Sequence, residues 1–207
     1  STPFITAYFA QDKVFCSPKV SLQALIHSEV ITNSARNKVL LDLFIQAAEL
    51  KSDSIQTSAA QAGLSTSFAV KNNALAINFY GFYQHMPLFV ETILKELKNT
   101  SIDKVSFDNI LDSLKTQYQE QEASLSIIKA QERFITNQNK TPTTKTLLKT
   151  IDTVTIQEFQ SFCSKIFNKT QIQCLISGSV EEKLALNLCN SIKSICQNKV
   201  LAEYEKD

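Results

Sequence analysis

One segment of the chain, Ala59–Leu97, holds three local structural signals at close spacing. A helix ends at Gly63, where glycine can take the left-handed backbone that terminates helices without strain. The pair Asn72-Asn73 then suits the tight turn of a two-stranded hairpin, because asparagine tolerates positive φ angles. Pro87 marks the first turn of another helix. The segment therefore predicts a helix, a hairpin and a second helix in direct succession.

Hydrophobic spacing predicts the other elements. Apolar residues alternate over Val20–His27, which predicts a half-buried strand, and Ile172–Ile176 is typical of a buried strand. A long helical stripe begins at Ala35, with Asn33 or Ser34 as its N-cap. Further helices are predicted at Pro87–Leu97, Phe107–Tyr118, Leu125–Asn137 (a continuation of the preceding helix or a separate one), Leu147–Ile151, Thr155–Ile166 and Val180–Gln197.

The order of these elements predicts an α+β fold, with an antiparallel or mixed sheet and helices packed on one face. In the hairpin, Gly81 is expected to end the second strand, and Leu64, Thr66, Phe68, Val70, Leu75, Ile77 and Phe79 are expected to pack under the helices. The remaining hairpin residues, which alternate with these, are mostly small or polar, and we expect them on the sheet face opposite the helices. They are Ser65, Ser67, Ala69, Lys71, Ala74, Ala76, Asn78 and Tyr80.

Length and charge favour a single domain over residues 1–207, with 1–13 as a lead-in segment and 203–207 as a frayed tail. The net charge of +1 comes from 21 basic and 20 acidic residues, which gives no sign of a nucleic-acid or anionic-membrane partner. No apolar run approaches the roughly 18 residues of a membrane span. Because the chain starts at Ser1 without a signal peptide, we expect it to be part of a longer, multi-domain protein.

The five cysteines, Cys16, Cys163, Cys174, Cys189 and Cys196, form no C-x-x-C pair. An odd number without disulfide-like spacing, in a chain of this length, predicts reduced thiols and favours a reducing compartment such as the cytoplasm. Cys189 and Cys196 are expected to share one helix face as small buried residues.

Four stretches together resemble the M16 family of zinc metallopeptidases, the insulinase or pitrilysin group, and within it the third, middle domain. They are the lead-in Tyr8–Phe15 with Pro18-Lys19, the helix exit Ala59–Leu64, the hairpin Ser65–Tyr80 with the helix from Pro87, and the strand and turn Cys174–Val180. The chain departs from the family where Asn72-Asn73 replaces the usual glycine of the turn. The resemblance implies one of four similar domains that enclose a peptide chamber, with the small and polar face of the hairpin toward the chamber.

Catalysis in this family needs an H-x-x-E-H helix whose histidines bind zinc and whose glutamate activates water. This chain has only His27 and His85, neither of which has a second histidine at helical spacing, so both are interpreted as ordinary surface or loop residues. We therefore expect no catalytic, cofactor-binding or metal-binding residue here, and the resemblance places zinc in the first domain of the parent protein. The expected partners are the other M16 domains of that protein and its peptide substrate.

Three functions stay open from the sequence. The first is the non-catalytic chamber wall of an insulinase-like zinc metalloendopeptidase that degrades peptides. The second is a structural M16-like scaffold subunit without peptidase activity, similar to the core proteins of respiratory complexes. The third is an unrelated helical interaction module. The aromatic set Phe79, Tyr80, Phe82 and Tyr83 could contact peptide, but core packing and hairpin stability are the preferred explanation.

Overall fold

A computed structural model describes residues 5–71, 73–123, 130, 134, 141–196 and 199–200. The helix predicted at Leu125–Asn137 and the tail 203–207 lie almost wholly or wholly outside these residues. The described elements are β1 (Ile5–Gln11), β2 (Lys19–Ser28), α1 (Ala35–Gln61), β3 (Ser65–Lys71), β4 (Ala74–Phe82), α2 (Met86–Lys98), α3 (Lys104–Glu122), α5 (Thr144–Ile151), α6 (Ile156–Lys165), β5 (Lys169–Gly178), α7 (Glu182–Ile195) and β6 (Lys199–Val200). The α+β prediction is confirmed.

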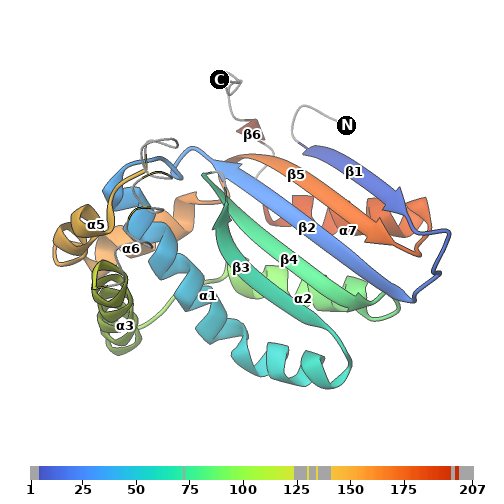
Figure 1. The fold of residues 1–207 in the computed structure, drawn as a ribbon, viewed down its shortest axis with the longest axis horizontal. Coiled ribbons are helices and arrows are strands. Elements are labelled where there is room, and N and C mark those ends of the chain that lie inside the picture. The colour runs from blue at the N-terminus through green and yellow to red at the C-terminus, as the bar shows by residue number, and fades with distance from the viewer. Residues whose placement is uncertain are drawn as a thin grey trace.

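The strands form one mixed sheet in the order β1-β5-β2-β4-β3 (Figure 1). The late strand β5 lies between β1 and β2, parallel to β1 and antiparallel to β2. β2 pairs antiparallel with β4, and β4 pairs antiparallel with β3 through the predicted hairpin. The two-residue strand β6 extends the β1 side by pairing with the start of β5. β3 is therefore an outer strand of the sheet.

The helices cover one face of this sheet. α2 and α7 run behind the strands in Figure 1, and α1 passes from the α3–α5–α6 group to the β3 side. The core residues of the strands alternate along this face, and they include Leu22, Ile77, Phe79 and Ile176, each at most 1% exposed. Burying such apolar surface is the main driving force of the fold. The opposite sheet face carries no helix among the residues that the structure describes.

The long helix α1 begins and ends where the sequence predicts. The Ser34 hydroxyl accepts a hydrogen bond from the Asn37 backbone N–H at 3.2 Å, which satisfies one of the free donors of the first turn. At the other end Gly63 has a φ of +70°, in the left-handed region expected of a residue that follows a helix. Of the two predicted N-cap candidates, Asn33 and Ser34, the structure uses Ser34, and the predicted helix end at Gly63 is confirmed.

The prediction that Gly81 ends β4 is wrong, because the strand continues to Phe82. Gly81 has a φ of +145°, which L-amino acids with side chains rarely adopt. A Cβ atom here would lie 2.4 Å from the carbonyl oxygen of Gly63. Glycine is thus required at this position for close backbone approach between the helix exit and β4, and not as a strand terminator.

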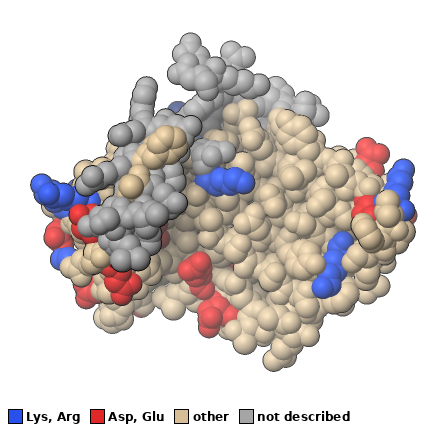
Figure 2. Space-filling model, in the orientation of Figure 1, with Lys and Arg blue, Asp and Glu red and all other residues tan. Residues whose placement is uncertain are grey.

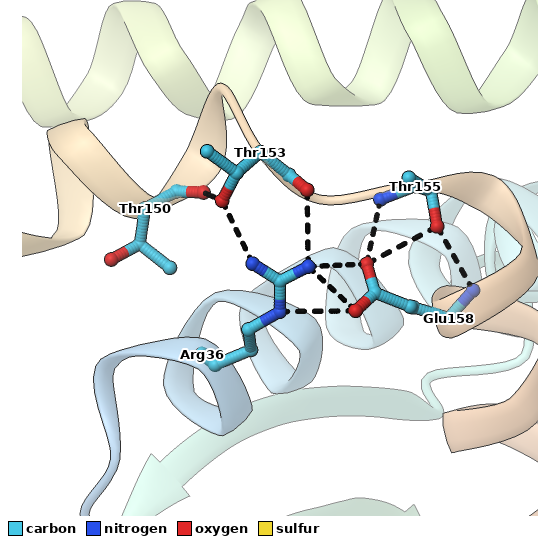
Figure 3. Close-up of polar contacts among 5 residues, drawn as sticks. All are labelled: Arg36, Thr150, Thr153, Thr155 and Glu158. Atoms are coloured by element: carbon cyan, nitrogen blue, oxygen red, sulfur yellow. Dashed lines mark hydrogen bonds and ion pairs between the residues drawn. The ribbon is translucent and has the colours of Figure 1, made fainter.

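A hydrogen-bonded cluster joins the start of α1 to the α5–α6 connection (Figure 3). Arg36 donates to the Thr153 hydroxyl at 2.8 Å, to the Thr153 carbonyl at 3.0 Å, and to both carboxylate oxygens of Glu158. Glu158 also accepts from the Thr155 backbone N–H at 3.0 Å, which completes a capping box on α6. The hydrogen bond from Arg36, followed by that from Thr155, lowers the pKa of Glu158. The charges of Arg36 and Glu158 are thus paired with each other, and the cluster holds the start of α1 against the α5–α6 connection.

A second polar link joins α1 to α3. The buried Tyr118 hydroxyl donates to Asp42 Oδ2 at 2.5 Å, while Lys38 Nζ lies 2.9 Å from Asp42 Oδ1. Burial, the charge of Asp42 and the hydrogen bond to it raise the pKa of Tyr118 well above its usual range. The folded state therefore keeps this phenol neutral at pH values where an unfolded tyrosine ionises.

We predict that Tyr118→Phe lowers the free energy of unfolding by about 1–2 kcal/mol at pH 8, since the variant loses a hydrogen bond to a charged group. The native pKa is raised, so this contribution is complete below the unfolded tyrosine pKa of about 10 and declines as pH rises above it. Denaturant curves at pH 8 and pH 11 should show the gap between wild type and variant shrinking by about 1.4 kcal/mol per pH unit above 10. An unchanged gap would contradict the assigned link.

Candidate functional site

The candidate site is the sheet face opposite the helices, which we call the open face. Alternate residues of all five long strands form it: Thr6, Tyr8, Ala10, Lys19, Ser21, Gln23, Leu25, His27, Ser65, Ser67, Ala69, Lys71, Ala74, Ala76, Asn78, Tyr80, Phe82, Lys169, Gln171, Gln173, Leu175 and Ser177. None of these is acidic. Figure 2 shows this face, which is uncharged over most of its area. It is a broad polar and apolar surface with a few lysines.

The structure confirms which set of alternate hairpin residues faces the helices and which set lies on the open face. Phe79 is 1% exposed on the helix side, whereas Tyr80, the next residue, is 50% exposed on the open face. Ser65, Ser67 and Ala69 are also exposed, and the Asn78 amide donates to the Ser67 hydroxyl at 3.2 Å. Ala74 and Ala76 depart from the expectation, because both are buried although they lie on the open side.

An aromatic and cationic group lies at one end of the open face. The Lys19 ammonium lies 5.4 Å from the Tyr80 ring centroid and 5.6 Å from that of Phe82, which are cation–π distances. Phe82 is 36% exposed, and its ring also lies over Gly63, where an added Cβ would meet it at 2.7 Å. Core packing therefore explains Phe79 and half-buried Tyr83 but not the exposed Tyr80 and Phe82, for which hairpin stability stays a prediction.

The two histidines lie at opposite ends of the sheet. His27 is near the end of β2, and burial lowers its pKa. His85 precedes α2, beyond the end of β4 that pairs with Lys19. At about 3.3 Å of rise per strand residue, the two side chains are separated by roughly 25 Å along β2, which prevents joint metal binding. Among the residues that the structure describes, no group of three or more His, Cys, Asp or Glu residues could hold a metal ion.

The cysteines are all free thiols in the structure, and only Cys16 is fully exposed. Burial raises the pKa of Cys163 to about 12 and that of Cys196 to about 11. The buried Cys174 thiol has a raised pKa because it is hydrogen-bonded to Cys189 and because it is buried. Thiolate is the reactive form, so these positions are poor nucleophiles at neutral pH.

We predict that a thiol-specific reagent at pH 8 modifies Cys16 at once in the native chain and the other four cysteines only on unfolding. Absorbance titration with Ellman's reagent should thus count one fast thiol natively and five in denaturant without reductant. Fewer than five in freshly purified protein would reveal a crosslink and contradict the prediction of reduced thiols. Cys16→Ser supplies the control, since it should remove the fast phase alone.

Two grooves lie between helices, away from the residues of the open face. The larger, of about 910 Å³, separates α1 from α3 and is lined by both apolar and charged residues, among them Leu50, Glu49 and Asp53. The smaller lies between α1 and α2 and contains Ile55, Ala59 and Leu88. Among the described helices, none is long and apolar enough to cross a membrane.

Comparisons with known proteins agree with this geometry. The family described as the middle or third domain of M16 peptidases matches residues 1–150. The peroxisomal insulin-degrading enzyme-like 1 of Arabidopsis thaliana is 21% identical over 199 residues, which are 95% of this chain and 20% of that protein. A nardilysin-like protein of the same plant is 21% identical over 198 residues, covering 92% of this chain and 19% of its own length.

The fold itself matches a solved structure. The crystal structure of pitrilysin superimposes with a TM-score of 0.87 at 18% sequence identity, over 94% of this chain and 21% of that one. The chain thus spans about a fifth of the length of the relatives that it matches.

Proposed function

Because the chain belongs to the M16 peptidase family as its middle or third domain, we propose that it is a non-catalytic wall of a peptide-degrading chamber. The open face is the observation that carries this proposal. All five long strands contribute exposed side chains to it, and the helices are packed on the other face. A broad surface of this kind, with no carboxylate among its residues, suits contact with many different peptides better than recognition of one.

The proposal places the zinc site in another domain of the parent protein. The described residues contain no group able to bind a metal, and His27 and His85 lie too far apart to cooperate. In M16 enzymes an H-x-x-E-H helix holds zinc and activates the attacking water. The role of this chain would be to enclose the peptide and exclude bulk water, rather than to take part in bond cleavage.

The first test uses the 207-residue chain. We predict that protein purified without chelator holds no stoichiometric zinc and cleaves no fluorogenic peptide, since paired histidine ligands are missing from its sequence. Metal analysis and a fluorescence assay measure both quantities. One tightly bound zinc per chain, together with turnover that a chelator abolishes, would contradict the non-catalytic assignment.

The second test concerns the open face in the full-length parent, with the glutamate of its H-x-x-E-H helix changed to glutamine. A photo-crosslinking amino acid at Ser67, on the open face, should capture a bound peptide substrate. The same amino acid at Asn187, exposed on α7 in the helix layer, is the matched control and should not. Crosslinks from Asn187 alone would contradict the chamber-wall orientation. A parent that turns over no peptide with its helix intact would favour the scaffold function instead.

A further inference from the structure

The groove of about 910 Å³ between α1 and α3 presents apolar side chains to solvent. Leu50 of α1 is 54% exposed, and half-buried Ile45 lines the groove from the same helix. Ile110 and Leu114 line it from α3. A leucine left in water lacks the stabilisation that full burial gives. A partner that covers Leu50 would therefore gain binding energy.

The same groove carries negative charge that no cation neutralises. Glu49 and Asp53 line it from α1, and within the described residues neither forms an ion pair. Asp42 differs, because it is bound to Lys38 and to the Tyr118 hydroxyl. Burial raises the pKa of Glu49, as expected for a carboxyl group without a cation beside it. Figure 2 shows acidic side chains over the middle of α1.

The charge lies on one wall of this groove. All the side chains that α3 contributes to it are uncharged. The groove between α1 and α2 is also apolar, with Ile55 and Leu88 among its residues, but the described residues that line it include no carboxylate. Apolar surface and unpaired carboxylates thus occur together in the larger groove and not in the smaller one.

A helix with basic side chains fits this combination. A helix pairs its own backbone N–H and C=O groups, so it can lie on an apolar groove without leaving them unpaired. Glu49 and Asp53 are four residues apart, which is about 6 Å along α1. Lysines or arginines four residues apart on a second helix have the same spacing. Such a helix can pack against both α1 and α3, at the usual interaxial distance of about 8–10 Å.

We propose that the groove between α1 and α3 binds a basic amphipathic helix of a separate polypeptide. Its apolar face would cover Leu50 and Ile110, and its basic side chains would pair with Glu49 and Asp53. A neutral or acidic helix would desolvate these carboxylates without a partner, which costs free energy. The inference goes beyond the chamber wall and does not depend on it, because helices and not the open face form the groove.

Fluorescence anisotropy with the 207-residue chain tests this binding. The probe is a labelled, capped peptide of about 18 residues, because shorter isolated helices are marginally stable in water. Leucines form one face of its helix, and lysines four residues apart lie beside them. A second peptide carries glutamate at each lysine position. The lysine peptide should bind at least about tenfold more tightly, since the glutamate peptide places like charges against Glu49 and Asp53. Equal affinities would overturn the proposal.

A charge-matched pair of variants tests the contact with the carboxylates. Glu49→Gln combined with Asp53→Asn should weaken binding of the lysine peptide about fivefold, as expected for the loss of two exposed ion pairs. Asp112→Asn combined with Glu182→Gln removes the same charge from exposed positions outside the groove and should leave the affinity unchanged. Equal weakening by both pairs would show that net charge, and not this groove, sets the preference.

The apolar contact has its own matched control. Leu50→Ala should weaken binding of the lysine peptide about fivefold, because the peptide loses apolar surface to cover. Leu88→Ala truncates an exposed leucine in the groove between α1 and α2 and should have no effect. Both leucines are exposed, so neither variant should unfold the chain. Equal losses from the two variants would contradict binding between α1 and α3.

The same titration with the full-length parent identifies the source of the helix. Binding with similar affinity would support a separate polypeptide. Binding to the 207-residue chain but not to the parent would show that another part of the parent covers the groove, and it would overturn the proposal. Absence of binding to both proteins would also overturn it. None of these outcomes alters the result expected from crosslinking at Ser67, so the chamber wall and the helix groove can fail separately.

Discussion

Replacement of Phe79 by alanine is expected to lower the free energy of unfolding by about 3–5 kcal/mol. The ring is 1% exposed between the sheet and the helix layer, and it packs edge-to-face against Phe89 of α2 with ring centroids 5.8 Å apart. Truncation removes buried apolar surface, leaves a cavity and breaks the aromatic pair. Urea denaturation monitored by circular dichroism measures the loss, with an unchanged m-value as the sign that the same two states are compared.

The adjacent residue supplies the matched control. Tyr80→Ala also removes an aromatic ring from β4, but this ring is 50% exposed on the open face, and its cation–π contact with Lys19 is worth no more than about 1 kcal/mol at such a site. Ser67→Ala and Asn78→Ala, also on the open face, should each change stability by no more than about 0.5 kcal/mol. A larger loss from these three variants than from Phe79→Ala would mean that the strand faces are assigned in reverse.

Local signals were enough to predict most elements of this fold. The Ser34 cap, the left-handed Gly63 and the alternation about Phe79 each depend on residues within a few positions of one another. Such signals act through backbone preference and side-chain period, which do not require knowledge of the rest of the chain. The hairpin, the two faces of its strands, and the helices before and after it could therefore be predicted from the sequence.

Contacts between distant segments could not be predicted in this way. The apolar pattern predicts the strand β5, but it does not show that β1 is a strand of the sheet rather than a lead-in segment, or that β5 inserts between β1 and β2 with parallel pairing on one side. That pairing joins residues more than 160 positions apart, such as Ile5 and Ile172, and is decided by packing of the whole core. For the same reason the sequence did not reveal that β3 is an outer strand, or that the Lys19 ammonium lies at cation–π distance from the Tyr80 and Phe82 rings.

Gly81 shows how a local rule can fail for a tertiary reason. Glycine commonly ends strands, and that rule predicted a strand end where β4 in fact continues. The actual requirement is the approach of the Gly63 carbonyl oxygen, which comes from the exit of α1, eighteen positions earlier in the sequence. The two glycines are far apart in the sequence, but in the folded chain the carbonyl oxygen of Gly63 lies directly against the Cα of Gly81.

This contact predicts that Gly81→Ala lowers the free energy of unfolding by at least about 2 kcal/mol. Two causes act together, since the φ of +145° is strained for alanine and its Cβ would lie 2.4 Å from the Gly63 oxygen and 2.9 Å from the Leu64 Cα. These are backbone atoms, so relief requires the helix exit to move away from β4. Chemical denaturation measures the loss, and a variant with wild-type stability would show that the glycine contact is not present.

Gly63→Ala is the comparison that separates backbone from side-chain clashes. Its φ of +70° costs alanine about 1–2 kcal/mol, and its nearest neighbour is the Phe82 ring at 2.7 Å, a side chain that can rotate away. Removing that ring with Phe82→Ala should therefore reduce the cost of Gly63→Ala by at least about 0.5 kcal/mol in a double-mutant cycle. The same ring removal should leave the cost of Gly81→Ala unchanged, because the atoms that clash there belong to Gly63 and Leu64. Equal rescue of both glycine variants would mean that Phe82, and not the backbone of the helix exit, limits the space beside Gly81.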